Sequence, residues 1–112
     1  MLKSSREVVL KMYDVPATPT FKVTMHAQRE ILGIVTDPST GTRKFLVQEP
    51  ESGSTKDFSF EMIELGQVFD KPNLWAYLGE TYVVVDPTSD RPWAATWYVY
   101  GERVGQLTSF VF

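Results

Sequence analysis

The sequence predicts a small, mostly β protein. Apolar and polar residues alternate with a period of two along several short runs, turn-forming residues separate those runs, and aromatic residues are abundant for a chain of 112 residues. A chain of this length builds one hydrophobic core, so residues 1–112 are expected to form a single domain. We expect about seven short strands and at most one short helical turn, in a small antiparallel barrel or rolled sheet (SH3-like or OB-like), with a sandwich as the alternative.

The first half of the chain is expected to hold four strands, over residues 8–14, 21–26, 31–36 and 43–48. In the first of them, Val8, Leu10 and Met12 alternate with charged or polar neighbours. The segment 37–42 contains Asp, Pro and Gly, which favour tight turns, and it predicts a hairpin between the third and fourth strands. Residues 49–56 are rich in Pro, Ser and Gly and are expected to be a loop.

The second half begins with a fifth strand through Phe58, Phe60 and Met62, after which the alternation changes phase. This change predicts a bulge or a helical turn near Met62. Residues 72–78, with Pro at the start and Gly79 after the end, suggest one short helical turn. Residues 81–85 are strongly β-prone and are expected to form a central strand, followed by a loop over residues 86–92.

The end of the chain, residues 92–112, reads as a terminal hairpin around which the rest is organised. Gly101 and Glu102 suit a two-residue type II′ turn. The resulting register pairs Val99 with Val104 and Tyr100 with Arg103, and it sets Trp93 opposite Phe110 and Tyr98 over Gly105. It places Trp97 on the face opposite Tyr98 and Tyr100, and Trp97 is our first choice for a core aromatic residue.

Composition narrows the class of protein. With 43% hydrophobic and 22% charged residues the chain lies in the ordinary globular range, and the net charge of −3 is concentrated in the aromatic-rich second half. Cysteine is absent, which excludes a disulfide scaffold, a thiolate metal site and a cysteine nucleophile. No apolar run is long enough for a secretory or membrane segment, so we expect no membrane partner and a cytoplasmic location.

Catalysis has little support in the sequence, and the protein is expected not to be an enzyme. The single histidine, His26, lies on a predicted strand, and no Gly-x-Ser-x-Gly motif supplies a nucleophile. Glu61 and Glu64 form a carboxylate pair only if residues 60–66 are helical. Residues 86–90 carry two aspartates but lack the ligand spacing of an EF-hand. No metal or cofactor is expected.

Two binding functions remain. Small barrels bind single-stranded nucleic acids by stacking bases on aromatic residues within a basic groove. The candidates for such a face are Phe21, Lys22, His26, Arg29, Arg43, Lys44 and Phe45. The acidic charge of the chain opposes this alternative, because phosphate contacts dominate nucleic-acid affinity.

Protein recognition fits more of the sequence, because Tyr, Trp and Arg are enriched at binding hot spots. The candidates are Trp75, Tyr77, Tyr82, Trp93, Tyr98, Tyr100 and Arg103. Nearby acidic residues, Glu80, Asp86, Asp90 and Glu102, favour a partner with a basic surface. The expected function is therefore that of an adaptor, accessory subunit or inhibitor. A homodimer is also plausible if residues 108–112 form an open edge strand.

Overall fold

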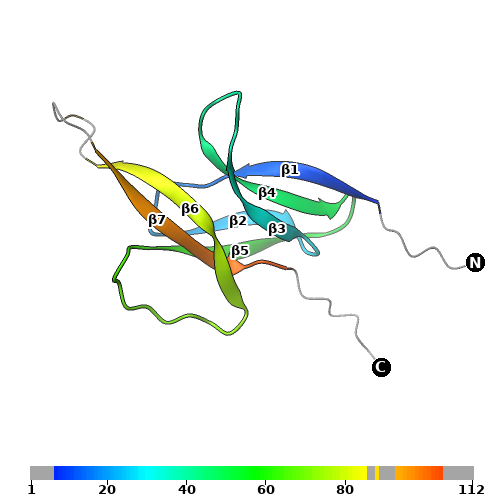
Figure 1. Ribbon diagram of the computed structural model, residues 1–112. Coiled ribbons are helices and arrows are strands. Elements are labelled where there is room, and N and C mark those ends of the chain that lie inside the picture. Colours follow the sequence, from blue (N-terminus) through cyan, green and yellow to red (C-terminus); the bar gives the residue numbers. More distant parts are fainter. Residues whose placement is uncertain (1–6, 86–87, 89–92, 105–112) are drawn as a thin grey trace, which may run out of the picture.

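The computed structural model describes residues 7–85, 88 and 93–104, and these contain seven strands and no helix. The strands are β1 (Val8–Asp14), β2 (Thr20–His26), β3 (Glu30–Thr36), β4 (Arg43–Pro50), β5 (Thr55–Ile63), β6 (Trp75–Val85) and β7 (Trp93–Glu102). They form two antiparallel sheets, ordered β1-β4-β3 and β2-β5-β7-β6, which do not close into a barrel (Figure 1). The mostly β prediction is confirmed. No helix among the described residues has the length and apolar character needed to cross a membrane.

The hairpin of β3 and β4 forms as predicted, and its turn is held by Asp37. The Asp37 amide donates to the carbonyl of Thr42 (2.8 Å), and the Asp37 carboxylate accepts from the Ser39 amide (2.9 Å). Lys44 forms an ion pair with the same carboxylate (3.0 Å). These contacts, the Ser39 amide first, lower the pKa of Asp37 to about 2. Local turn chemistry therefore sets the register of this hairpin.

The core lies between the two sheets. Phe45 from β4 contacts Phe60 from β5 with ring centroids 4.9 Å apart, and Phe21 from β2 stacks on Phe60 at 5.3 Å. Trp97 is half-buried and packs against this core, as predicted. Within the described part of the chain, the buried residues of the core cluster are Met25, Ile31, Ile34, Phe45, Val47, Phe58, Phe60, Met62, Leu78 and Val99.

The phase change after Met62 has a different cause from the one predicted. β5 runs through to Ile63 and pairs with β7 without a register shift, so the bulge or helical turn expected at Met62 is wrong. Ile63 is buried although it lies on the face opposite the core, beside Tyr98. An apolar residue suits this position because neighbouring side chains, among them Tyr98, cover the outer face at Ile63.

The predicted helical turn over residues 72–78 is also wrong. The Trp75 amide bonds the Pro72 carbonyl (3.0 Å) in a single turn, and β6 then starts at Trp75. Gly79 lies within this strand, at a bulge after Tyr77, with a φ of 143°. Among the described strands, β6 lies at the end of its sheet and pairs there only with β7. It is therefore an edge strand of the described sheet and not the central strand predicted for residues 81–85.

The predicted turn at Gly101 and Glu102 is absent, because β7 continues straight through both residues. Val99 pairs with Met62 and Gly79, not with Val104, and Tyr100 pairs with Glu61 and Tyr77, not with Arg103. The hairpin is instead made by β6 and β7, whose far end projects beyond the other strands (Figure 1). Of the predicted second arm, Arg103 and Val104 are described, and Val104 pairs with Glu30 of β3 and not with Val99. The rest of that arm, including Gly105 and Phe110, lies outside the described residues.

The loop predicted over residues 49–56 is shorter in the structure. β4 extends to Pro50 and β5 begins at Thr55, which leaves residues 51–54 as the connection. Of the loop predicted over residues 86–92, only Thr88 is among the described residues. The long connection of the described chain is instead the segment 64–74 between β5 and β6, which bows away from the strands in Figure 1.

Candidate functional site

Aromatic side chains gather on the outer face of the four-stranded sheet, the face turned away from the core. Because paired residues on neighbouring strands share a face, the pairing of Tyr77 with Tyr100 and of Ile63 with Tyr98 places these residues together. Phe69, from the 64–74 segment, contacts Tyr100. We call Phe69, Trp75, Tyr77, Tyr98 and Tyr100 the outer aromatic face.

The three tyrosines and Phe69 form a continuous cluster of tilted rings. The ring centroids of Tyr77 lie 6.1 Å from Tyr98 and 5.8 Å from Tyr100, and those of Phe69 and Tyr100 lie 5.0 Å apart. Tyr77 is 44% exposed, whereas Tyr98 and Tyr100 are half-buried. Burial raises the pKa of Tyr77, and nearby Glu80 raises it further. The cluster is partly open, as is typical of a binding surface rich in tyrosine.

The 64–74 segment borders this cluster and exposes its own apolar side chains. Leu65 is 87% exposed and Val68 is 95% exposed. A cleft of about 250 Å³ lies between the segment and β7, lined by Ile63, Glu64, Leu65, Gly66, Gln67, Phe69, Tyr98 and Tyr100. Apolar side chains of a partner have room to enter here beside the rings.

Trp75 extends the same face toward β2. It stands between two further clefts, of about 300 Å³ and 210 Å³. The first is lined by Thr20, Phe21, Lys22, Ser59, Phe60, Glu61 and Trp75, and the second by Lys56, Asp57, Phe58, Ser59, Trp75 and Glu102. The outer face is therefore apolar along β6 and β7 and polar along β2 and β5.

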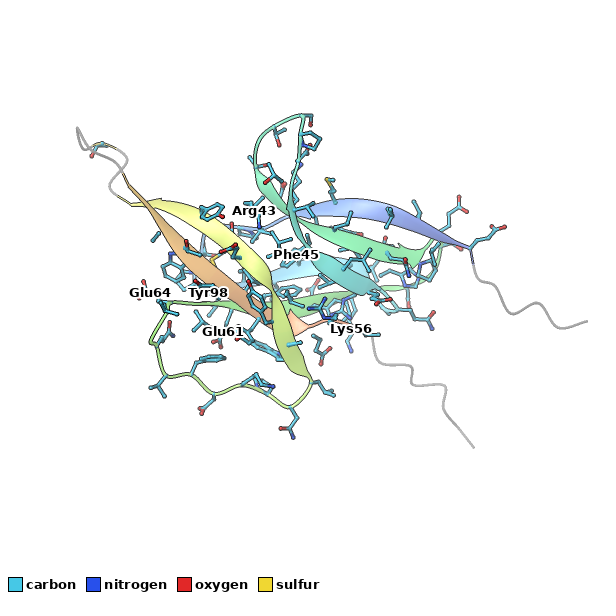
Figure 2. The ribbon with its side chains drawn as sticks, in the orientation of Figure 1. Arg43, Phe45, Lys56, Glu61, Glu64 and Tyr98 are labelled. Carbon is cyan, nitrogen blue, oxygen red and sulfur yellow. The ribbon has the colours of Figure 1, made fainter. Side chains whose placement is uncertain are left out.

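Carboxylates surround the outer aromatic face. Figure 2 shows Glu61 and Glu64 with Tyr98 on the side of the sheet that faces the 64–74 segment. Glu61 is paired with Tyr100 in the strand register, and Glu80 is paired with Tyr98. Among the described residues, the ion pairs involve only Lys11 with Glu49 and Lys44 with Asp14 and Asp37. Glu61, Glu64 and Glu80 thus carry negative charge that this part of the chain does not neutralise by an ion pair.

The remaining predicted protein-binding residues are not part of the outer aromatic face as defined above, and one of them stabilises the fold. Arg103 donates to the carbonyls of Ile31 (3.0 Å) and Tyr77, so its guanidinium ties the two sheets together. Tyr82 is exposed farther along β6, with the Arg43 guanidinium 5.5 Å from its ring centroid. Trp93 begins β7, and its side chain lies outside what the structure describes.

The predicted nucleic-acid-binding residues do not share one face. Phe45 is fully buried in the core between the sheets (Figure 2), and Phe21 is half-buried against it. Lys22 is exposed on β2, whereas Lys44 is paired with Asp37. Arg43 donates to the carbonyls of Glu80 (2.8 Å) and Ile34 (3.4 Å) and to the Thr36 hydroxyl (3.1 Å).

Arg29, another of these candidates, is fully buried. Its guanidinium carbon lies 3.4 Å from the centroid of the Phe58 ring, and its Nη2 donates to the carbonyl of Glu102. Nε and Nη1 of Arg29 have no hydrogen-bond partner among the described residues. Burial lowers the pKa of Arg29 to about 10, and the charge of Glu102 partly opposes this shift. Arg29 holds the end of β7 and is not available to a phosphate.

His26 belongs to a buried polar cluster with Glu49. The Gln28 amide donates to Nδ1 of His26 (2.9 Å), so the ring proton lies on Nε2, which donates to the Ser52 carbonyl (2.9 Å). Glu49 accepts from the Tyr13 hydroxyl (2.9 Å) and pairs with Lys11 (2.9 Å). Burial alone would raise the pKa of Glu49, but these two partners outweigh it and lower the pKa. Both ring nitrogens of His26 thus bond backbone groups of the connections that follow β2 and β4, and the Glu49 carboxylate holds β1 against β4.

The proposed carboxylate pair of Glu61 and Glu64 loses its premise, since residues 61–63 belong to a strand and not to a helix. Asp86 and Asp90 lie outside the described residues. Within the described ranges, no group of three or more His, Cys, Asp or Glu residues is placed to hold a metal ion.

Sequence reasoning missed Phe69, Ile63 and the 64–74 segment as parts of the site. One signal was available: Ile63 is the apolar residue in the otherwise polar series Asp57, Ser59 and Glu61. An apolar residue on the outward-pointing face of a strand indicates that another part of the chain covers the strand there. Comparison of the chain with protein-family models, curated proteins and solved structures finds no match.

Proposed function

We propose that this protein is a non-enzymatic binding module that recognises a basic segment of another protein through its outer aromatic face. The observation that carries the proposal is the partly open ring cluster of Tyr77, Tyr98 and Tyr100, which lies beside carboxylates that form no ion pair with the described residues. Tyrosines bury large areas at low entropic cost and keep a hydroxyl for hydrogen bonds. Such a module acts as an adaptor, accessory subunit or inhibitor, by occupying a surface of its partner.

The chemistry of the partner follows from the composition of the face. Arg and Lys side chains bind well over tyrosine rings, and their charges pair with carboxylates such as Glu61 and Glu64. The aliphatic stems of these side chains fit against Ile63 and Leu65 in the cleft beside Tyr98. A basic segment with one or two apolar residues therefore suits this surface better than an acidic one.

The alternative, single-strand nucleic-acid binding, has less support. It requires an SH3-like or OB-like barrel with a shared basic face, whereas Arg29 and Phe45 are buried and the sheets do not close. The outer face also carries carboxylates, which repel a polyanion.

The test is affinity capture from cell lysate with nuclease present, followed by binding measurements on the captured protein. Glu61→Lys with Glu64→Lys should weaken that interaction at least tenfold and leave the fold intact, because neither residue is buried. Glu51→Lys is the matched control, since it changes an exposed charge in the 51–54 connection and should leave affinity nearly unchanged.

A second variant tests the rings. Tyr98→Ala with Tyr100→Ala should abolish capture in a protein that still unfolds cooperatively in urea. If capture depends on nucleic acid, or if the Glu61 and Glu64 variant binds as the original protein does, the proposed face is wrong.

A further inference from the structure

The ladder between β5 and β7 leaves part of β5 without a strand on one side. β2 pairs with β5 along residues 55–61, whereas β7 pairs with it only along residues 60–63. Beyond the end of β7 the chain crosses to the other sheet, where the Ile31 amide donates to the Arg103 carbonyl (2.7 Å). Among the described strands, residues 55–59 therefore have a neighbour only on the β2 side. We call these residues the open stretch of β5.

Two residues of the open stretch direct their backbone groups to the side without a strand. The Met62 amide donates to the Pro19 carbonyl (2.8 Å), and the Ser54 carbonyl accepts from the residue that follows β2 (3.0 Å). Even-numbered residues of this strand thus bond toward β2. Because this direction alternates along a strand, Thr55 and Asp57 direct N–H and C=O away from β2. Both residues are exposed, and an added strand forms its hydrogen bonds with such groups.

A cleft and a buried cation accompany the open stretch. The cleft has a volume of about 210 Å³ and is lined by Lys56, Asp57, Phe58, Ser59, Trp75 and Glu102. The buried guanidinium of Arg29 lies against two of these residues, since its carbon is 3.4 Å from the Phe58 ring centroid and Nη2 donates to the Glu102 carbonyl. Its Nε and Nη1 have no hydrogen-bond partner among the described residues. Buried donors of this kind favour an acceptor supplied from outside.

The core side of the open stretch is positively charged. Lys56 points to this side, because it is paired with the fully buried Met25. Neither Lys56 nor Arg29 forms an ion pair with the described residues. Glu49, the buried carboxylate on the core side, already has an ion-pair partner. The charge of Glu102 acts on Arg29 from the other side of the sheet, without an ion pair.

The outer side of the open stretch is negatively charged. The strand register places the carboxylates of Asp57, Glu61 and Glu102 on this side, together with the cation Lys22 of β2. Arg103 follows Glu102, but its guanidinium is held by carbonyls of β3 and β6. The two faces beside the open stretch therefore differ in the sign of their charge.

We propose that the open stretch of β5 is a strand-addition site, where an extended segment of a partner protein takes the place of the missing strand. Side chains of such a segment alternate between the two faces of the sheet. Acidic residues opposite Lys56 and Phe58 meet the positive core side, and basic residues opposite Asp57 meet the outer carboxylates. A carboxylate is also the acceptor best suited to the free donors of Arg29. The occupant is thus a segment with alternating acidic and basic residues.

This site is separate from the outer aromatic face, with which it shares only Trp75. Figure 2 shows Lys56 and Glu64 toward opposite ends of β5. The proposal does not rest on the proposed function, since it requires neither the tyrosine cluster nor its cleft. Tyr98→Ala with Tyr100→Ala should accordingly leave strand addition unchanged.

The test is an NMR titration of the protein with an acetylated and amidated peptide in which the charges alternate (Arg-Glu-Arg-Glu-Arg-Glu-Arg). The amide signals of Thr55 and Asp57 and the Nε–H signal of Arg29 should shift in a saturable way, with a Kd of about 1 mM or below. A peptide of the same composition with its charges in blocks (Arg-Arg-Arg-Arg-Glu-Glu-Glu) should bind about tenfold more weakly, because its charges do not match the two faces.

Asp57→Pro and Asp57→Ala are a matched pair of variants. Both remove the carboxylate that accepts from the Thr24 hydroxyl, but only proline removes the N–H that faces the added strand. This N–H does not bond to β2, so the ladder between β2 and β5 keeps its hydrogen bonds. Asp57→Pro should bind the alternating peptide about tenfold more weakly than Asp57→Ala does. Urea unfolding checks that both variants are folded.

A second measurement does not depend on the folding of the proline variant. The alternating peptide, methylated at its backbone nitrogens, should not bind the original protein, because it can no longer donate to the strand edge. The proposal is overturned if the alternating peptide shifts none of the named signals. It is also overturned if the alternating and block peptides bind equally, if the two Asp57 variants bind equally, or if methylation leaves binding unchanged.

Discussion

At Glu49, a carboxylate that is almost removed from water determines how a neighbouring strand is oriented. Tyr13 donates to both of its oxygens, at 3.0 and 2.9 Å, and Lys11 pairs with one of them. Burial, followed by the hydrogen bond to Glu49, raises the pKa of Tyr13 to about 12. A buried carboxylate without partners would destabilise the fold strongly, so β1 must present Lys11 and Tyr13 to the core side.

Replacing the charge at Glu49 tests this account. Glu49→Gln should lower the free energy of unfolding near pH 7 by about 1–3 kcal/mol, because Lys11 loses its partner while remaining half-solvated. The folded state lowers the pKa of Glu49, so its stabilising effect is present above the ordinary value of 4.5 and is lost as pH falls below it. Urea unfolding from pH 7 to pH 3 should therefore show the variant and the original protein converging in acid.

The control for this series is Glu51→Gln, two residues farther along the chain and exposed. It should change stability little at any pH. A stability difference for Glu49→Gln that is the same at pH 3 and pH 7 would show that the charge of Glu49 is not what matters.

At the scale of elements, the pairing of β5 with β7 depends on a close contact between a ring and a glycine. Phe60 is paired with Gly101, and a Cβ atom at Gly101 would lie 2.4 Å from Cδ1 of Phe60. The ring thus covers the glycine directly and fills the space that a side chain would need. Gly101 is required for this contact and not for a turn.

Gly101→Ala should accordingly lower the free energy of unfolding by about 1–3 kcal/mol through overpacking. The cost should be smaller when Phe60→Leu is already present, because the shorter side chain leaves room for a methyl group. A double-mutant cycle by chemical denaturation measures this coupling. Additive effects of the two substitutions would argue against the contact.

At the scale of the whole molecule, the two sheets are joined closely where β3 passes β6. A Cβ atom at Gly79 would lie 2.9 Å from Cβ of Ile34 and 3.1 Å from its amide nitrogen. Nearby, the Ile31 amide donates to the Arg103 carbonyl (2.7 Å), and Arg43 donates to the Glu80 carbonyl (2.8 Å). Backbone contacts and two arginines therefore join the sheets at one side of the core.

Gly79→Ala should lower the global free energy of unfolding by about 2–4 kcal/mol, because the methyl group meets backbone and φ is positive. Gly66→Ala is the control: its φ of 87° is also positive, but nothing lies within 4 Å. It should cost only about 1 kcal/mol. Thermal unfolding of both variants separates the effect of crowding between the sheets from that of backbone strain. Equal losses of stability in the two variants would contradict the close approach of Gly79 to Ile34.

These glycines also show what the sequence can and cannot predict. The strands and the turn at Asp37 follow from alternation and local hydrogen bonding, and the structure confirms them. Gly79 and Gly101 look like local signals for a helix end and a turn, but their actual causes are Ile34 and Phe60, distant in sequence. Residue patterns do not reveal such long-range contacts.

The candidate site was predicted only in part, because some of its contacts are also between residues distant in sequence. Strand alternation correctly separates Tyr98 and Tyr100 from Trp97, because that relation is local. Phe69 reaches Tyr100 only through the course of a long connecting segment, and Arg29 is buried only because β7 ends beside it. Neither position follows from the neighbours of these residues in the chain.

The tilted rings of Tyr77, Tyr98 and Tyr100 also have an optical consequence. Aromatic chromophores 5.8 to 6.1 Å apart, at interplanar angles of 48° and 52°, couple their electronic transitions. Such coupling adds bands to the far-ultraviolet circular dichroism of the folded protein, where strands give only a weak dichroic signal. Spectral estimates of its strand content will therefore be distorted, and an unusual spectrum is compatible with the intact fold.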